Sequence, residues 1–165
     1  MNSDNILSFI QRSIMEHTQE GRLLTEIILD TFKLNGVLVL EGDKLVKSLK
    51  LTSARWKILG ALAYGNNPFT VPDIARGMGQ SRQAVQRISK EMVEDGLLAT
   101  LPNPEHKRAK LLKLTDTGAQ AYNQAMEKQI PWVNGLASDI KQTDLEIASS
   151  VLQKLIAQLD KNPVN

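Results

Sequence analysis

Apolar residues recur at helical spacing over most of this chain, which predicts a mainly helical protein. Residues 4–17 form one amphipathic pattern, in which four apolar side chains fall roughly on one face: Ile6, Phe9, Ile10 and Ile14. Residues 52–64 form another, and Thr52 or Ser53 is suited to cap that helix. Its apolar positions are Trp56, Ile58, Leu59 and Leu62.

Two short helices are predicted next. Thr70 is suited to cap the first, and Asp73 lies three residues further on, at the position of a capping box. Gly77 and Gly79 are expected to end this helix, because glycine is favoured where a helix stops. Ser81 is predicted to cap the second helix, whose apolar spacing continues to residue 92.

A β-hairpin is expected after these helices. Residues 97–114 contain two short apolar runs that flank a tip of two prolines, an asparagine and several charges. Short apolar runs around such a tip are typical of two strands joined by a long exposed loop.

Two further helices complete the predicted pattern. The first begins at Thr115 or Thr117 and should be kinked by Pro131, because proline lacks an amide donor. The second begins at Thr143, with Glu146 closing a capping box. It carries a broad apolar stripe made by Leu145, Ala148, Val151, Leu152, Leu155, Ile156 and Leu159.

Residues 21–48 give conflicting signals. Leu24, Ile28 and Phe32 have the spacing of a long helix, but residues 35–40 (NGVLVL) combine a hairpin-like Asn-Gly pair with β-branched residues. The local sequence therefore leaves both a helix and a strand or turn open here.

Composition excludes several classes of protein. The 165 residues contain no cysteine and two histidines, so thiol chemistry is absent and a histidine-rich metal site is not expected. No apolar run is long enough to span a membrane, and the first residues do not resemble a signal peptide, so a cytoplasmic protein is expected. No catalytic constellation, cofactor motif or metal motif is found: Asp43, Glu94 and Asp95 are interpreted as solvated helix-end charges rather than an acid–base pair.

The two short helices have the spacing of a helix-turn-helix unit. Ala75 is small enough for a close helix crossing, Gly79 allows the turn, and Val85 and Ile88 can seal the angle between the helices. The other face of the second helix is rich in hydrogen-bond donors suited to phosphates and base edges: Ser81, Arg82, Gln83, Gln86, Arg87 and Lys90. A solvated polar face without a partner is the plain alternative.

Charge along the chain favours DNA over that alternative. The net charge is only +2, but residues 76–113 hold eight Lys and Arg against four Asp and Glu. The hairpin tip contributes His106, Lys107, Arg108 and Lys110. A helix-turn-helix followed by a basic hairpin is a winged helix-turn-helix, and a segregated basic segment is typical of a nucleic-acid-binding face.

Three segments resemble the MarR (multiple antibiotic resistance regulator) family of bacterial transcription factors: LTSARWKILGAL, TVPDIARGMGQSRQAVQRISKEMVEDGLL and NPEHKRAKLLKLTDTG. The resemblance implies that residues 21–48 are mostly helical, bent near Gly36 or Gly42. It places Arg108 at the family's minor-groove arginine, with His106 where an acidic residue is usual. It also implies dimerisation through residues 1–50 and 119–165, around a winged helix-turn-helix domain at 51–118.

The function implied is that of a homodimeric regulator of a palindromic operator in double-stranded DNA, most simply a repressor released by a small ligand. Phe32, Trp56 and Tyr64 could border such a ligand's pocket, and ordinary core packing is their alternative role. A winged-helix protein-interaction module that does not bind DNA is the alternative function. Enzymatic activity is not expected.

Overall fold

The computed structural model describes residues 17–65, 68–106 and 109–161. The amphipathic helix predicted over residues 4–17 lies outside this region apart from His17. The elements in chain order are α2 (Gln19–Val46), the 3-10 turn η1 (Lys47–Leu49), α3 (Ser53–Tyr64), β1 (Phe69–Thr70), α4 (Val71–Gly77), α5 (Arg82–Glu94), β2 (Leu98–Leu101), β3 (Leu111–Leu114), α6 (Asp116–Ala137) and α7 (Gln142–Lys161).

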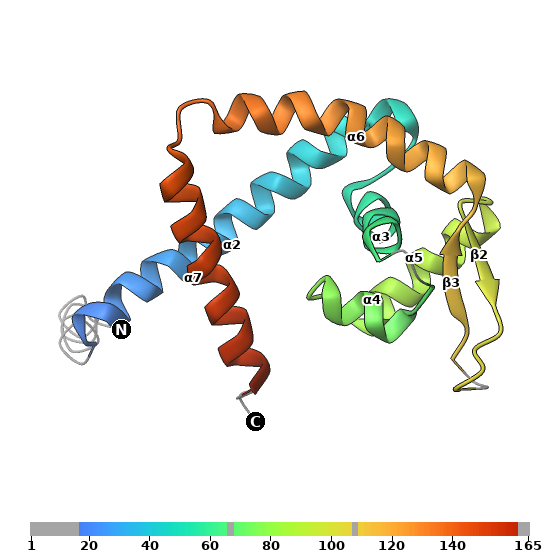
Figure 1. Ribbon diagram of the computed structural model, residues 1–165, viewed down its shortest axis with the longest axis horizontal. Helices are drawn as coiled ribbons and strands as arrows, with labels where there is room; N and C mark the ends of the chain where they lie inside the picture. The colour runs from blue at the N-terminus through green and yellow to red at the C-terminus, as the bar shows by residue number, and fades with distance from the viewer. Residues whose placement is uncertain (1–16, 66–67, 107–108, 162–165) are drawn as a thin grey trace, which may run out of the picture.

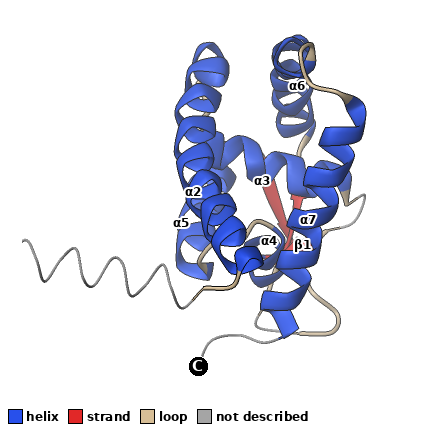
Figure 2. Ribbon diagram, turned by 90° about the vertical axis from the view of Figure 1, so that its left-hand side faces the viewer, coloured by secondary structure: helices blue, strands red, loops and turns tan. Residues whose placement is uncertain are grey.

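The chain combines a compact unit with three long helices (Figure 1). Helices α3, α4 and α5 gather against the small sheet, whereas α2 and α6 extend from this unit as rods and α7 follows at the far end of α6 (Figure 1). Figure 2 shows how few strands lie among the helices. The predicted fold class, mainly helical with a small β-wing, is confirmed.

Helix α2 resolves the conflict at residues 35–40 in favour of helix, as the family resemblance implied. It runs without interruption through Asn35 and Gly36, and Thr18 caps it by accepting a hydrogen bond from the Gly21 amide at 3.0 Å. Helix propagation adds one hydrogen bond per residue once a nucleus exists, so strong helical sequence on both sides outweighs a short stretch of strand preference.

The core of the structure lies inside the compact unit. The buried hydrophobic residues run from Val46 to Ala125, and the helix-turn-helix angle is sealed as predicted, with Ala75, Val85 and Ile88 all buried. Gly79 has a φ of +60°, a left-handed conformation that glycine adopts without strain. The residues whose spacing suggested a helix-turn-helix are therefore the ones that pack between its two helices.

The wing has one more strand than the sequence predicted. Besides the expected hairpin of β2 and β3, the two-residue strand β1 pairs antiparallel with β3, Phe69 opposite Leu112, giving the order β1-β3-β2. A two-residue strand is too short to show an alternating pattern, so only the pairing reveals it. The strand ties the wing to the start of α4.

The C-terminal helices are close to the prediction. Thr115 caps α6 by accepting from the Gly118 amide at 3.0 Å, and this helix continues through Pro131 to Ala137. The predicted capping box at Thr143 is wrong. Helix α7 begins one residue earlier, and Glu146 accepts a hydrogen bond from the Gln142 side chain instead.

Large apolar side chains are exposed along the three long helices. Helix α7, which the structure describes in full, contains no buried residue. On α2 and α7 the most exposed of these side chains include Leu29, Phe32, Leu40, Ile147, Ile156 and Leu159. Apolar surface on this scale marks an interaction site rather than ordinary exposure.

The end of α2 is locked to the start of α3. The Ser53 amide donates to Asp43 Oδ1 at 2.6 Å, and the Ser53 hydroxyl donates to the Val39 carbonyl at 2.9 Å. Gly42 is buried against Ser53, and a Cβ there would overlap the Ser53 hydroxyl. Asp43 is therefore a structural acceptor at this joint, which corrects its interpretation as a solvated charge.

A second close approach joins α6 to the wing. A Cβ on the buried Gly118 would overlap the backbone carbonyl oxygen of Leu97. The same carbonyl accepts hydrogen bonds from the amide and the hydroxyl of Thr115. The N-terminus of α6 is thus held against the strand that opens the wing.

Among the described residues, no helix is both long and apolar enough to cross a membrane.

Candidate nucleic-acid interface

Helix α5 presents two opposite faces. Val85, Ile88 and Met92 are buried in the core, whereas Arg82, Gln83, Gln86, Arg87 and Lys90 are exposed. Ser81 caps the helix as predicted, accepting from the Ala84 amide at 3.2 Å. The five α5 side chains singled out from the sequence are therefore all exposed to solvent.

The charge along α5 runs against its backbone dipole. Its first turn has no acidic residue and contains Arg82, while Glu91, Glu94 and Asp95 gather at its end. A helix N-terminus is favoured by negative charge and a C-terminus by positive charge. The arrangement weakens the isolated helix but leaves its N-terminus ready to receive an external anion.

A groove of about 680 Å³ separates α5 from the wing. Its lining brings together residues from both parts of the predicted site: Arg82, Gln83, Gln86 and Lys90 from α5, and Lys110 from the wing. The start of α4 and the inner face of the hairpin close its sides, through Val71, Pro72, Thr100 and Leu112. Exposed cations and amides thus surround an open channel.

Ser89 of α5 also lines this groove. Its side chain is 1% exposed, and its hydroxyl oxygen has no hydrogen-bond partner among the described residues. Sequence analysis did not single out this residue, because a serine within a helix carries no positional signal of its own.

A neighbouring hollow of about 640 Å³ lies at the base of the hairpin loop, where His106 and Arg82 both line it. Asp73 lies here too, in the predicted capping box with Thr70. The Thr70 hydroxyl, helped by the Thr70 amide and by Arg76, holds the pKa of Asp73 below its usual range, although burial opposes this. Lys107 and Arg108 lie outside the described residues.

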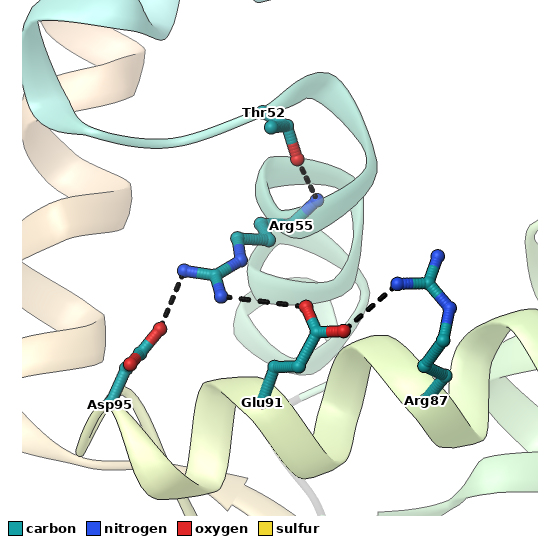
Figure 3. Close-up of polar contacts among 5 residues, drawn as sticks. All are labelled: Thr52, Arg55, Arg87, Glu91 and Asp95. Carbon is teal, nitrogen blue, oxygen red and sulfur yellow. Dashed lines mark hydrogen bonds and ion pairs between the residues drawn. The ribbon is translucent and has the colours of Figure 1, made fainter.

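Arg87 stands apart from the groove. Its guanidinium pairs with Glu91 one turn along α5, at 2.8 Å (Figure 3). Glu91 and Asp95 also pair with Arg55 of α3, at 3.6 and 2.7 Å. Asp95 is therefore an ion-pair partner rather than a solvated charge, and Glu94 lies 3.9 Å from Lys90. Arg55 was missed because its partners lie 36 and 40 residues further along the chain.

A second cavity, of about 350 Å³, lies where α2, α3 and α6 meet. Trp56 and Tyr64 line it, and Trp132 does so too, so both tryptophans of the chain border this cavity. Phe32 does not line it and is 69% exposed on α2. Helix α2 carries Phe32 more than one turn beyond Leu38, the lining residue nearest to it in sequence.

Two tyrosines form one end of this cavity. The Tyr64 ring lies edge-on to Tyr122, with 6.4 Å between the ring centroids. Burial and the adjacent Tyr64 raise the pKa of Tyr122 to about 12. Part of this rise in pKa comes from a side-chain hydrogen bond between the two tyrosines, so the Tyr122 hydroxyl is already engaged with Tyr64.

Comparison with known proteins points to transcriptional regulators. The model of the MarR family matches residues 49–109. An uncharacterised protein of Mycobacterium tuberculosis is 31% identical over 136 residues, which cover 82% of this chain and 94% of that protein. The transcriptional activatory protein BadR of Rhodopseudomonas palustris is 30% identical over 91 residues, about half of each chain.

Solved structures share the fold. A mutant of MarR from E. coli, determined in complex with operator DNA, superposes with a TM-score of 0.64 and 23% sequence identity. The match covers 80% of this chain and 97% of that one. A match over 80% of the chain is longer than the winged unit at residues 51–118, so the likeness extends to the long helices as well.

Proposed function

The chain belongs to the MarR family of transcriptional regulators, and we propose that it acts as a homodimer that binds a palindromic operator in double-stranded DNA. The observation that carries this proposal is the groove between α5 and the wing, whose lining combines the cations of Arg82, Lys90 and Lys110 with the amides of Gln83 and Gln86. Cations bind phosphates and amides bind base edges, so one surface has the means for both.

Two copies of this surface are needed for a palindrome. The exposed apolar faces of α2 and α7 support the proposed dimerisation through residues 1–50 and 119–165, on either side of the DNA-binding domain at 51–118. Two recognition helices related by a two-fold axis can enter successive major grooves about one helical turn apart. Because a regulator of this kind acts on the chromosome, we propose that the protein is cytoplasmic.

Selection from a random duplex pool tests the proposal. We expect an enriched palindrome, bound with an affinity that falls steeply as salt rises, because each phosphate contact releases counterions. Binding of no duplex at low salt would favour the winged-helix protein-interaction module.

Within the proposed site, the DNA backbone is contacted by Ser81, Arg82, Arg87, Lys90, His106 and Lys110. The minor-groove role of Arg108 and the part of Lys107 stay predictions from the sequence.

Gln86 is the proposed base reader. Its amide is exposed in the groove, and glutamine pairs bidentately with adenine. We expect Gln86→Ala to weaken binding of the selected operator by about 1–3 kcal/mol and to relax one position in each half-site. Gln120→Ala, at an exposed position of α6, is the control. An equal loss on every duplex would assign Gln86 to the backbone instead.

We propose that the protein represses and that a small aromatic ligand releases it from DNA. A dimer seated on an operator excludes other proteins from the same duplex, which is the simplest route to repression. BadR is named as an activatory protein, so the fold also serves the opposite sign. Transcription from a promoter that overlaps the selected operator distinguishes repression from activation. Deletion of the gene for this protein raises that transcription only if the protein is a repressor.

The cavity between α2, α3 and α6 is the proposed ligand site. Trp56, Tyr64, Tyr122 and Trp132 offer aromatic faces to a ligand. Because both tryptophans of the chain line it, a bound aromatic compound should change intrinsic fluorescence. We expect at least one compound from a library of aromatic acids and phenols to change this fluorescence and to lower the affinity of the protein for its operator. Trp132→Phe should weaken that response, and fluorescence unchanged by every compound would contradict the assignment.

A further inference from the structure

Four charged side chains join α3 to the recognition helix α5. Glu91 faces two arginines at once: its Oε1 accepts a hydrogen bond from Arg87 at 2.8 Å, and its Oε2 forms an ion pair with Arg55 at 3.6 Å. Arg55 also pairs with Asp95 at 2.7 Å (Figure 3). The two arginines differ in access, because the Arg55 side chain is 21% exposed and that of Arg87 is 69% exposed.

This difference separates the roles of the two arginines. Arg87 lies on the exposed side of α5 and can turn toward a DNA phosphate, whereas Arg55 is held behind the helix by Asp95. When Arg87 leaves Glu91 for a phosphate, Glu91 keeps one cation only because Arg55 remains. Without Arg55, that exchange would leave Glu91 and Asp95 uncompensated next to a polyanion, and like charges brought together oppose binding.

We propose that Arg55 is a positioning residue for DNA binding: by neutralising Glu91 from behind, it frees Arg87 to exchange its carboxylate partner for a phosphate. The inference rests on the proposed function, in which Arg87 contacts the DNA backbone. Arg55 itself touches no DNA. Its contribution to affinity is the removal of a competitor for Arg87.

A double-mutant cycle between Arg55 and Glu91 tests this inference on the full-length protein and its selected operator. We expect Arg55→Gln to weaken binding about tenfold, or about 1.4 kcal/mol, and to lower the salt slope by about one unit, as if a phosphate contact were lost. Adding Glu91→Gln removes the competitor. The double variant should therefore recover affinity to within about threefold of the parent, together with the slope.

Controls separate this role from a structural one. Lys44→Gln removes one positive charge from an ion pair on α2, where Lys44 meets Glu41 at 2.7 Å, and should leave binding within about twofold of the parent. Thermal unfolding of each variant reports damage to the fold. If the Arg55→Gln/Glu91→Gln variant binds as weakly as Arg55→Gln, or if the salt slope stays unchanged throughout, the inference is overturned.

Two further measurements distinguish failure of the inference from failure of the proposed function. Arg87→Ala should lower the salt slope of the parent by about one unit, and an unchanged slope would remove Arg87 from the interface and overturn the inference with it. The Arg87 Nε–H resonance provides a readout without DNA. We expect slower side-chain motion in Arg55→Gln, because Glu91 then has Arg87 as its one arginine partner. Unchanged motion overturns the inference even if no duplex is bound.

Discussion

Replacing Ile156 and Leu159 by aspartate is expected to convert the proposed dimer to a folded monomer with at least about a hundredfold lower operator affinity. Both side chains are more than 60% exposed on α7, and no residue of α7 is buried within the chain. The substitutions therefore cost the isolated chain little, but in a dimer they bury charge without a partner, which costs several kcal/mol. A palindrome then loses simultaneous engagement of its two half-sites.

Sedimentation measures the assembly, and an operator titration measures the affinity. Gln153→Asp/Gln158→Asp is the matched control, because it adds the same two charges to exposed polar positions of the same helix. We expect the control to remain a dimer and to bind as the parent does. A dimer of unchanged stability formed by the Ile156→Asp/Leu159→Asp variant would show that α7 is not part of the interface.

Gly118→Ala is expected to lower the free energy of unfolding by about 3 kcal/mol, at the upper end of the cost of overpacking a well-packed site. The added methyl group would overlap the Leu97 carbonyl oxygen, a backbone atom that also receives two hydrogen bonds from Thr115. Relief requires moving the start of α6 away from the wing. The fold cannot make this adjustment with a side-chain rotation.

Denaturant unfolding of Gly118→Ala and of Gly77→Ala provides the comparison. Gly77 is the last residue of α4, and a Cβ there meets nothing within 4 Å. Alanine at that helical position should be neutral or stabilising by up to about 1 kcal/mol, because glycine is the weaker helix former. Equal stability of the Gly118→Ala variant and the parent would show that α6 and β2 are not tightly coupled.

Local signals in the sequence predicted local structure well. The caps at Thr70, Ser81 and Thr115 each depend on residues within one turn, so their hydrogen bonds follow the sequence closely. The helix-turn-helix was predictable for the same reason, because its spacing is set within fourteen residues. At residues 35–40 local preference pointed to two structures, and the surrounding helix decided between them.

Features built from distant residues were not predictable in this way. Strand β1 exists only because β3 passes beside it, and Arg55 finds its partners on another helix. The capping box expected at Thr143 has the right residue types but not the right helix start. Phe32 was grouped with Trp56 and Tyr64 as an aromatic residue, but the position of α2 keeps it away from the cavity.

The joint between α2 and α3 gives α2 the mechanical character of a lever. Its 28 residues span about 42 Å at a rise of about 1.5 Å per residue. Ser53, Gly42 and Asp43 fix one end to the winged unit, so α2 and α3 turn as one body at that end. A pivot of about 5° at the far end displaces the winged unit by about 4 Å, slightly more than the rise of about 3.4 Å per base pair. For the proposed operator binding, a rotation of a few degrees at the far end of α2 would therefore move the winged unit by about the rise of one base pair, without unfolding.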